Sequence, residues 1–546
     1  MLLTDMVSIL ALLGFCICWF RVGMARRDAL LWASASVALL ASIAGYANYR
    51  GTAMIALVVA LVLLLALVIR RLRGSRVLSG RPWASGVLFS LLTAIAAFGY
   101  WTFPNFEMPA PSGEHAVGVR DFELTDTSRK GVMAAAVDEP RRLLVRVWYP
   151  AGSVAGLEPR PYFTDAEAAT SQVFTHFRHV DTHSYENAPL LSGASMQPVV
   201  FFSHGYQGRL SQNTGLMEEL ASHGYIVYSV AHTYDGPEGV FPNGDPIPED
   251  DKLWEEALES ALPGGKAVDK VNGPTMAERR AGMIAMLERY TRDNTRFHRS
   301  RGVWIEDRLF VKDELMAGRV DPAMAEIAAA GDFIRVGHTG MSFGGSTAVS
   351  VCWQDADCAA AVNLDGGNFD PQLFNRSVDK PLLMFMHDWP VMNKLTDGDQ
   401  GWDYSEYGYA DLSYEAHSVA GTRDDIYRLR VKDVQHFGVT DMIMAVRGPV
   451  KSVIFGGIDG PTMMAVINDF VRGFFDKHVR GLDNNFPAAQ FAEHSESVVP
   501  HDAGRVRDWW NSLSETERAE LPVRPDVAGA LLEADKAGRA AVSGEL

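Results

Sequence analysis

Four apolar runs within the first 103 residues constrain this chain more than any other feature. They are Leu2–Phe20, Leu30–Ala47, Thr52–Ile69 and Trp83–Phe103, and each is close to the roughly 20 residues with which a helix crosses a hydrocarbon core. Lipid offers no partners for backbone polar groups, so such runs predict four transmembrane helices. A cleaved signal peptide is the alternative for the first run, but it requires positive charge before the apolar core, and none precedes this one. Buried helices of a large soluble core are the alternative for all four runs.

Arginines predict the orientation of these helices. Three lie between the first and second runs, five lie between the third and fourth, and the loop between the second and third runs holds only Arg50. Loops rich in arginine stay in the cytoplasm, so the chain after Pro104 is expected to be extracytoplasmic. This predicts an integral protein of the bacterial inner membrane, with residues 1–103 as its membrane domain.

Charge separates the membrane domain from the rest. Residues 1–103 hold nine arginines, no lysine and two acids, whereas the remaining chain holds 41 basic and 65 acidic residues. A strongly acidic soluble portion argues against nucleic acid or anionic head groups as the main partner. Within that portion Cys352 and Cys358 form either a disulfide or two free thiols, and their spacing predicts no metal site.

Residues 104–116 are a proline-rich linker, and a pattern of strands and helices follows over 117–483. Buried strands that alternate with helices are typical of a doubly wound, mostly parallel α/β sheet. An insertion over about 236–331 is expected to cap the sheet, with a surface decoration as the alternative. Residues 484–546 form a polar C-terminal extension. The predicted strands, of which the first two are expected to pair at an edge, are Val117–Leu124, Leu143–Tyr149, Pro198–Ser203, Tyr225–Val230, Phe333–Gly337, Ala359–Leu364, Pro381–Met386 and Ile426–Val431.

The segment Gly340-Met341-Ser342-Phe343-Gly344 has the G-x-S-x-G pattern of a nucleophile elbow. In this motif a serine lies on a tight turn between a strand and a helix, and small residues two positions away let the backbone turn sharply. The context fits, because a short buried strand precedes the motif and a small-residue helix follows it. The pattern therefore predicts Ser342 as a catalytic nucleophile.

A serine hydroxyl needs a base to take its proton, and an acid to orient that base. In a doubly wound hydrolase the chain order is serine, acid, histidine. Two acids follow successive strands, namely Asp365 and, as the alternative, Asp388. His436 follows the last predicted strand and is the expected base, ahead of His387 and His417.

Negative charge that develops on the substrate needs two backbone N–H donors. The residue after the nucleophile, Phe343, is expected to supply one of them. The other is expected from Tyr206, in the loop that begins with His204 and Gly205 directly after a buried strand.

Together these motifs resemble the platelet-activating factor acetylhydrolase family of α/β-hydrolases. The resemblance is carried by His204-Gly-Tyr-Gln-Gly, Leu220-Ala-Ser-His-Gly-Tyr-Ile-Val227, Gly340-Met-Ser-Phe-Gly-Gly345, Leu364-Asp-Gly366 and His436, and it covers roughly Val117–Val479 apart from the insertion. In that family the acid follows the strand immediately after the elbow, which favours Asp365 over Asp388. The resemblance implies a triad of Ser342, Asp365 and His436, with Tyr206 and Phe343 as oxyanion donors. The four membrane runs and the charged insertion depart from the family pattern.

These observations predict a membrane-anchored serine hydrolase that cleaves carboxylic esters through an acyl-enzyme, without a metal or organic cofactor. Small-molecule or lipid esters, acetyl esters included, are the expected substrates. An acyltransferase that uses the same triad and a non-catalytic membrane-bound binding module are the alternatives. The acyl chain, the leaving group and the oligomeric state stay open.

Overall fold

A computed structural model describes most of the chain. The residues it describes are 2–21, 26–72, 82–131, 139–171, 174–237, 239–250, 252–253, 255–256, 285, 295–367, 370, 379–388, 423–500 and 514–516. The chain divides into two compact units, which are treated separately below. One comprises Met1–Met108, Pro161–Asp181 and Met444–Ser452, and the other comprises Pro109–Arg160, Thr182–Ile443 and Val453–Leu546.

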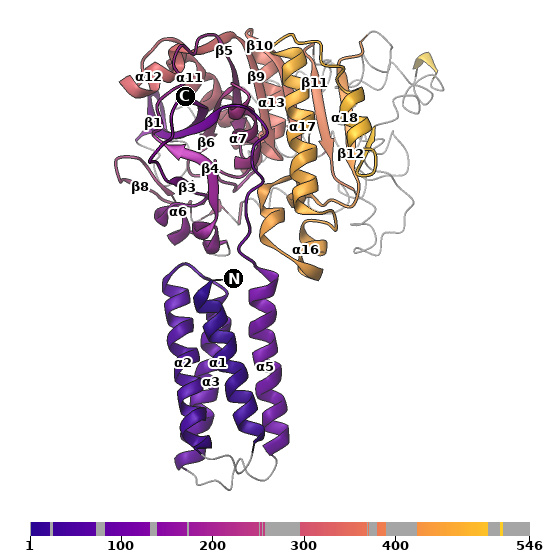
Figure 1. Cartoon of the computed structure of the whole chain (residues 1–546). Coiled ribbons are helices and arrows are strands. Elements are labelled where there is room, and N and C mark those ends of the chain that lie inside the picture. The colour runs from indigo at the N-terminus through magenta and orange to yellow at the C-terminus, as the bar shows by residue number, and fades with distance from the viewer. Residues whose placement is uncertain are drawn as a thin grey trace. The chain divides into compact units, whose positions relative to one another are not determined.

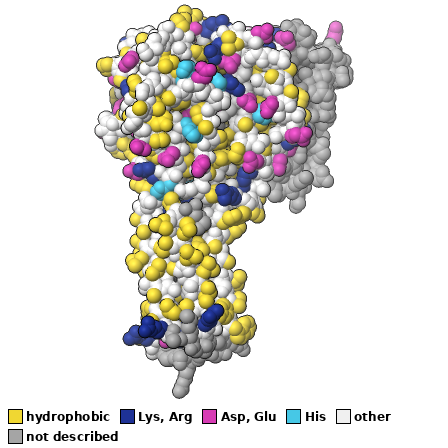
Figure 2. Space-filling view, viewed as in Figure 1, with side chains coloured by type: hydrophobic (Ala, Val, Ile, Leu, Met, Phe, Trp, Pro, Cys, Tyr) yellow, Lys and Arg dark blue, Asp and Glu magenta, His cyan; other side chains and the backbone are white. Residues whose placement is uncertain are grey.

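The first unit contains four long apolar helices, which match the four predicted runs closely. By length and composition all four are able to cross a membrane. Their described surface is mainly hydrophobic, with basic side chains gathered at one end (Figures 1 and 2), as expected for a lipid-facing bundle. The helices are α1 (Leu3–Phe20), α2 (Arg27–Ala47), α3 (Ala53–Leu72) and α5 (Pro82–Thr102).

A buried ion pair lies at the other end of this bundle. Arg50 Nε donates to Asp5 Oδ2 at 3.0 Å, and Arg50 Nη2 donates to the carbonyl of Phe103 at 2.7 Å. Both charged side chains are fully buried, and the hydroxyls of Ser8 and Ser42 form a hydrogen bond at 3.0 Å. Charges within a bundle of apolar helices are costly unless they are paired. The pair therefore accounts for an acid inside the first apolar run.

Two segments from later in the chain also belong to the helical unit. The hydroxyl of Thr175 accepts a hydrogen bond from Gly51 N–H at 3.1 Å, and Arg447 N–H donates to the carbonyl of Thr102 at 2.8 Å. The first segment holds α6 (Asp165–Ala169) and the 3-10 helix η2 (Thr175–His179), and the second holds the first part of α16 (Gly448–Ile454). No sequence motif indicated this association, because both segments are short and lie far along the chain from the four helices.

The second unit is built on one eleven-stranded sheet, which confirms the predicted α/β class (Figure 1). Six central strands, β6, β5, β9, β10, β11 and β12 in spatial order, pair in parallel. On either side of them, β2 pairs antiparallel with β6 and β13 pairs antiparallel with β12. The spatial order is β13-β12-β11-β10-β9-β5-β6-β2-β1-β4-β3. The strands are β1 (Ala116–Lys130), β2 (Pro140–Ala151), β3 (Pro159–Pro161), β4 (Asp181–Glu186), β5 (Gln197–Ser203), β6 (Ile226–Ala231), β9 (Gly331–Met341), β10 (Cys358–Leu364), β11 (Leu382–Met386), β12 (Ile426–Val431) and β13 (Val498–Pro500), and β7 (Gly239–Val240) and β8 (Pro246–Ile247) form a separate hairpin.

All eight predicted strands are present, but the first pair does not form an edge. β1 and β2 pair antiparallel as expected, and β1 then pairs in parallel with β4. The pattern Thr182-His183-Ser184 within β4 carries no apolar alternation, and the hydroxyls of Thr182 and Ser184 form hydrogen bonds to the Arg160 carbonyl and to Glu218. The expectation of an edge at β1 was therefore wrong.

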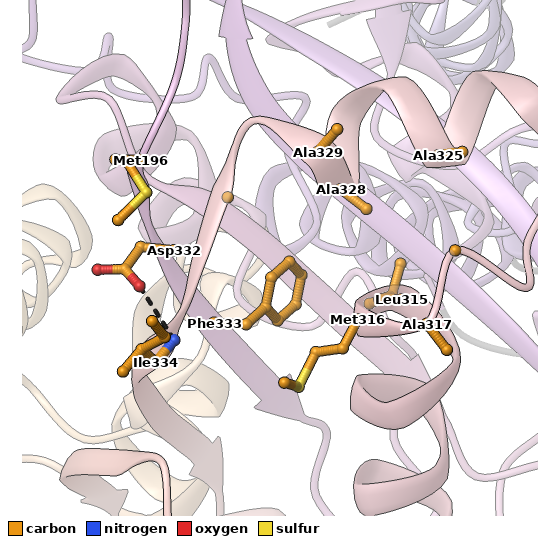
Figure 3. Close-up of a pocket in the computed structure, with 12 residues that line it drawn as sticks. Met196, Leu315, Met316, Ala317, Ala325, Ala328, Ala329, Asp332, Phe333 and Ile334 are labelled. Atoms are coloured by element: carbon orange, nitrogen blue, oxygen red, sulfur yellow. Dashed lines mark hydrogen bonds between the residues drawn. The ribbon is translucent and has the colours of Figure 1, made fainter.

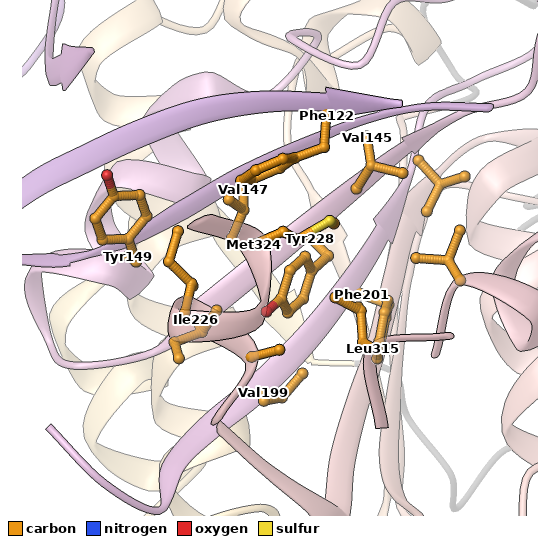
Figure 4. Packing of buried hydrophobic residues seen from close by; sticks show 14 of the residues in the cluster. Phe122, Val145, Val147, Tyr149, Val199, Phe201, Ile226, Tyr228, Leu315 and Met324 are labelled. Atoms are coloured by element: carbon orange, nitrogen blue, oxygen red, sulfur yellow. The ribbon is translucent and has the colours of Figure 1, made fainter. Parts of the chain in front are cut away.

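Helices cover both faces of the sheet. Side chains of α11 and α12 pack on the face that carries Val199 and Phe201 (Figure 4). Val200 points to the opposite face, since successive strand residues alternate. On that face α17 packs closely against Gly337 of β9, because a Cβ on Gly337 would lie 2.8 Å from the ring of Phe475. The covering helices are α7 (Thr214–Ser222), α11 (Arg296–Met316), α12 (Pro322–Ala329), α13 (Phe343–Gln354) and α17 (Gly460–His478); the short η5 (His436–Val439), η6 (Asp441–Ala445) and α18 (Ala488–Glu493) complete the described elements.

The last third of the predicted insertion is part of this core. Val311 and Leu315 of α11, and Met324 and Ile327 of α12, are buried in the main hydrophobic cluster. Helices that close the core are neither a cap nor a surface decoration, so the segment from about residue 296 onward is not insertion in that sense. Most of 257–294, the helix-like stretch predicted at 505–513 and His417 lie outside the described residues.

Two neighbouring glutamates of α7 are buried in opposite environments. Glu218 is fully buried and accepts a hydrogen bond from His183 N–H at 2.7 Å, and desolvation dominates, which raises its pKa to about 7. Glu219 is also desolvated, but hydrogen bonds from His223 and Ser112 outweigh burial and lower its pKa to about 2. The two carboxylates therefore contribute to stability with opposite signs.

We expect Glu218→Gln to stabilise the protein at pH 8 and Glu219→Gln to destabilise it. An unfolded glutamate ionises near pH 4.5, so between about pH 4.5 and 7 the unfolded chain releases a proton that folded Glu218 keeps. Stability then falls as pH rises, by on the order of 3 kcal/mol, and the amide removes this loss. The depressed pKa of Glu219 contributes stability that is present above about pH 4.5 and lost as pH falls toward 2. Thermal unfolding at pH 5 and pH 8 measures both effects, and shifts of equal sign at pH 8 would contradict the assignment.

Candidate active site

Ser342 lies on a sharp turn between β9 and α13. Its φ of 53° and ψ of −119° are rare for a residue with a side chain. Both motif glycines are required by close packing, because a Cβ on Gly340 would lie 2.3 Å from the Gly344 carbonyl oxygen. A Cβ on Gly344 would lie 2.2 Å from the carbonyl oxygen of Ser203. The motif therefore has the backbone geometry of a nucleophile elbow.

The structure brings Ser342, His436 and Asp365 into one chain of hydrogen bonds. His436 Nε2 lies 2.8 Å from Ser342 Oγ, and His436 Nδ1 lies 2.6 Å from Asp365 Oδ2. The acid is nearly buried, whereas the imidazole of His436 is 36% exposed. These contacts imply that Nδ1 carries a proton and that Nε2 accepts the serine proton, as a Ser-His-Asp relay requires.

Asp388, the alternative acid, lies apart from this relay. Its Oδ2 accepts a hydrogen bond from the backbone N–H of Asp433 at 2.9 Å, and Arg430 Nη1 lies 3.5 Å from its Oδ1. No hydrogen bond joins it to His436 among the described residues. Asp388 thus braces the loop that leads to His436.

His387, considered from sequence as a competing base, contacts the acid instead. Its Nδ1 lies 2.8 Å from both Asp365 oxygens, and its backbone N–H donates to Asp365 Oδ1 at 3.0 Å. Burial alone would raise the pKa of Asp365, but His387 and His436 together hold it well below its usual range. Asp365 is therefore ionised at neutral pH.

The Asp365, His387 and His436 ligand atoms lie within 4.8 Å of one another, a separation that could suit a metal ion. A metal ligand nitrogen must offer a lone pair. Both ring nitrogens of His436 are already engaged, one with Asp365 and one with Ser342. The donor set fits proton transfer better than metal binding.

The two predicted oxyanion donors lie on segments that touch. The Tyr206 and Phe343 rings are 5.4 Å apart at their centroids, and Phe343 is the first residue of α13, where N–H groups have no partner within the helix. A Cβ on Gly205 would lie 3.4 Å from Ser342 Cβ. The loop after β5 therefore runs directly against the elbow.

Hydrogen bonds fix the peptide between Gly205 and Tyr206. The Gly205 carbonyl accepts from His204 Nδ1 at 2.7 Å and from Gly208 N–H at 2.7 Å. In a trans peptide the C=O and the following N–H point in opposite directions, so these bonds also set the direction of the Tyr206 N–H. His204 Nε2 accepts from the His232 backbone N–H at 3.2 Å, which leaves the proton on Nδ1. Burial lowers the pKa of His204 to about 4, so the ring stays neutral.

A second Ser-His-Asp array lies beneath this loop. Ser203 Oγ lies 2.9 Å from His232 Nε2, and His232 Nδ1 lies 3.0 Å from Asp307 Oδ2. Arg141 donates twice to the same carboxylate, at 2.7 and 3.0 Å. The side chains of Ser203, His232, Asp307 and Arg141 are all buried. We refer to Ser203, His232 and Asp307 as the inner array.

Arg308, which follows Asp307 in α11, joins β5 and β9, the two strands that carry the site. Arg308 Nη2 donates to the Phe201 carbonyl of β5 at 2.7 Å, and Arg308 Nη1 donates to the Thr339 carbonyl of β9 at 3.0 Å. Sequence reasoning missed Arg308 and the inner array, because their members are far apart in the chain and follow no motif. One sequence signal could have indicated them. Residues 296–316 have no apolar stripe, and charged residues occur on every face of the helix.

A disulfide links the elements of the nucleophile and the acid. Cys352, near the end of α13, is bonded to Cys358, the first residue of β10. Of the two states expected for these cysteines, the structure has the disulfide.

A pocket of about 420 Å³ lies elsewhere in the second unit, between the end of α11, the end of α12 and the start of β9 (Figure 3). Its lining is mostly apolar, with Met196, Met316 and Phe333 among its side chains. The one acid there, Asp332, accepts a hydrogen bond from Ile334 N–H at 3.0 Å. This pocket therefore lacks the groups that ester chemistry needs.

Comparison with known proteins supports the fold. The family model of platelet-activating factor acetylhydrolase, isoform II, matches residues 100–236, a span that includes the oxyanion loop and ends before Ser342. The solved structure of a ferulic acid esterase from Streptomyces cinnamoneus aligns with a TM-score of 0.50 and 23% identity, over 73% of this chain and all of that one. No curated protein sequence matches the chain significantly. The chain has the α/β-hydrolase fold and resembles the platelet-activating factor acetylhydrolases.

Replacement of Asp307 by Asn is expected to destabilise the protein strongly. The carboxylate is the counter-charge for the buried guanidinium of Arg141 and lies 3.1 Å from Arg129 Nη1, and loss of one partner of a buried pair costs about 3–5 kcal/mol. The thermal midpoint should fall by roughly 5–10 °C. Glu306→Gln is the matched control, since that neighbouring acid is 39% exposed and contacts Arg129 only at 3.5 Å. Equal effects of the two substitutions would refute this role of Asp307.

Proposed function

We propose that this protein is a membrane-anchored serine hydrolase that cleaves carboxylic esters through an acyl-enzyme. The observation that carries the proposal is the hydrogen-bonded relay of Ser342, His436 and Asp365 on a nucleophile elbow. The match to the platelet-activating factor acetylhydrolase model and the esterase-like fold support ester hydrolysis as the reaction.

In this mechanism Ser342 Oγ attacks the ester carbonyl carbon while His436 Nε2 takes the hydroxyl proton. Asp365 holds His436 in the required tautomer and stabilises the imidazolium that forms. The N–H groups of Tyr206 and Phe343 bind the oxyanion. His436 then returns the proton to the leaving alkoxide, and a water activated by the same imidazole hydrolyses the acyl-enzyme. No step requires a metal or organic cofactor.

We further propose that residues 1–103 anchor the enzyme in the bacterial inner membrane and that the hydrolase domain, 117–483, is extracytoplasmic. Four helices long and apolar enough to cross a membrane support the anchor. Five described arginines at one end of the bundle, against Arg50 paired with Asp5 at the other, support the orientation. The disulfide between Cys352 and Cys358 fits an oxidising compartment. A hydrolase domain held at a membrane favours lipid or acetyl esters as substrates. In this proposal residues 104–116 are the linker and residues 484–546 are the C-terminal extension.

The relay is tested by three substitutions in the full-length enzyme. Ser342→Ala should lower kcat for a p-nitrophenyl ester by about four orders of magnitude or more, and Asp365→Asn should lower it by about four orders, because His436 then loses its orienting charge. Asp388→Asn is the control and should leave kcat within a few-fold. A fluorophosphonate should label the wild type at Ser342, which also separates an enzyme from a binding module. A greater loss at Asp388 than at Asp365 would reassign the acid.

The orientation is tested by reporter fusions in a bacterial host. Alkaline phosphatase, which folds only in an oxidising compartment, should be active when fused after Pro104 and inactive when fused after Arg71. The reverse pattern would place the hydrolase domain in the cytoplasm, and activity of both fusions would show that the fourth apolar helix, α5, does not cross the membrane.

A further inference from the structure

The carboxylate of Asp365 serves two imidazoles. His436 Nδ1 lies 2.6 Å from Oδ2, and His387 Nδ1 lies 2.8 Å from each oxygen. The His387 backbone N–H adds a bond of 3.0 Å to Oδ1. The acid of the proposed triad is thus shared between the base and a second titratable ring.

We propose that His387 is a positioning residue of the triad, which fixes Asp365 toward His436 and whose protonation weakens His436 as a base. The proposal rests on the function proposed above and assigns a further residue to the same site.

Sheet register places His387 beside the acid. β10 and β11 run in parallel with Leu364 opposite Phe385, and Asp365 N–H donates to the Phe385 carbonyl at 3.2 Å. Asp365 therefore leaves the end of β10 where His387 leaves the end of β11. Asp365 has a φ of 60°, a conformation uncommon for aspartate, and the donors of His387 hold its carboxylate in place there.

The charge state of His387 matters because the carboxylate is shared. With one proton on its ring, His387 donates a hydrogen bond and leaves the negative charge of Asp365 available to His436. With a second proton it becomes a cation that neutralises Asp365, and its ring centroid lies 6.0 Å from that of His436. The imidazolium that His436 must form during attack would then meet a like charge with less compensation.

The surroundings of His387 favour this second proton. Burial opposes the charged form, but the carboxylate of Asp365 outweighs it and raises the pKa of His387 above its ordinary value. Asp388, the next residue, adds negative charge, and Arg430 of β12 lies 3.5 Å from Asp388 and partly offsets it. His387 and His436 therefore titrate as a pair on one carboxylate, and the protons of such a pair are taken up in two macroscopic steps.

The test is the acid limb of log kcat/KM for a p-nitrophenyl ester, measured from pH 5 to 9 on the full-length protein in detergent. The wild type should fall with a slope steeper than one at low pH, because a proton on His436 removes activity and a proton on His387 lowers it further. His387→Asn keeps an amide donor near the Nδ1 position but does not titrate, so its slope should fall to one while its plateau stays within about threefold. His387→Leu removes the side-chain donor and should lower the plateau kcat by tenfold or more with little change in KM.

Two controls make the result decisive. His494, which lies 2.7 Å from Asp469 far along the chain from the triad, is a histidine paired with an acid, and His494→Asn should leave slope and plateau unchanged. The proposal is overturned if the acid limbs of the wild type and of His387→Asn both have a slope of one and share the same midpoint. This comparison holds even if the leucine variant fails to fold. Ser342→Ala in the same series distinguishes the two hypotheses: full activity there refutes the proposed function, whereas loss there with wild-type behaviour of both His387 variants refutes only this inference.

Discussion

The fully buried carboxylate of Asp307 is the charge on which the candidate site depends most. It pairs with Arg141 of β2 and with His232, which follows β6. A buried carboxylate stays ionised only when it is paired and hydrogen-bonded, and Arg141, Arg129 and His232 together hold its pKa far below the ordinary range despite burial. Through His232 the same carboxylate reaches Ser203, at the end of β5, where the loop with the proposed oxyanion donor Tyr206 begins. One charge on α11 thus ties three separate strands to the loop that faces the nucleophile.

The residues at strand ends could be predicted from the sequence, because parallel strands bring their carboxyl ends to one edge of the sheet. Ser342 was indicated by its glycines, and His436 by its place after the last parallel strand. The residues alone left Asp365 and Asp388 as alternatives, and only the family resemblance favoured the first. The structure brings Asp365 to His436, since the left-handed conformation of Asp365 turns the chain at the end of β10.

Other parts could not be predicted, because they depend on pairings between distant residues. Sequence patterns assume that charged side chains face solvent. In α11 Arg296, Asp307, Arg308 and Lys312 are all buried, and their partners come from strands and loops elsewhere in the chain. A core helix of this composition is indistinguishable by pattern from an exposed one, so the segment was taken for insertion. The same limit hid the contact of His387 with Asp365, which depends on the register of β10 and β11.

The inner array has the same Ser-His-Asp hydrogen-bond pattern as the proposed triad, but in buried surroundings. Ser203, His232 and Asp307 are spaced almost as Ser342, His436 and Asp365 are, yet their side chains are buried while His436 is 36% exposed. Ser203 Oγ also accepts from Arg308 Nη1 at 3.2 Å, which occupies an oxygen lone pair that attack would need. Ser342 instead lies on the sharp turn of the elbow, and its partner His436 is partly exposed. We attribute the proposed reactivity of Ser342 to the elbow and to access, whereas the buried array holds the neighbouring loop.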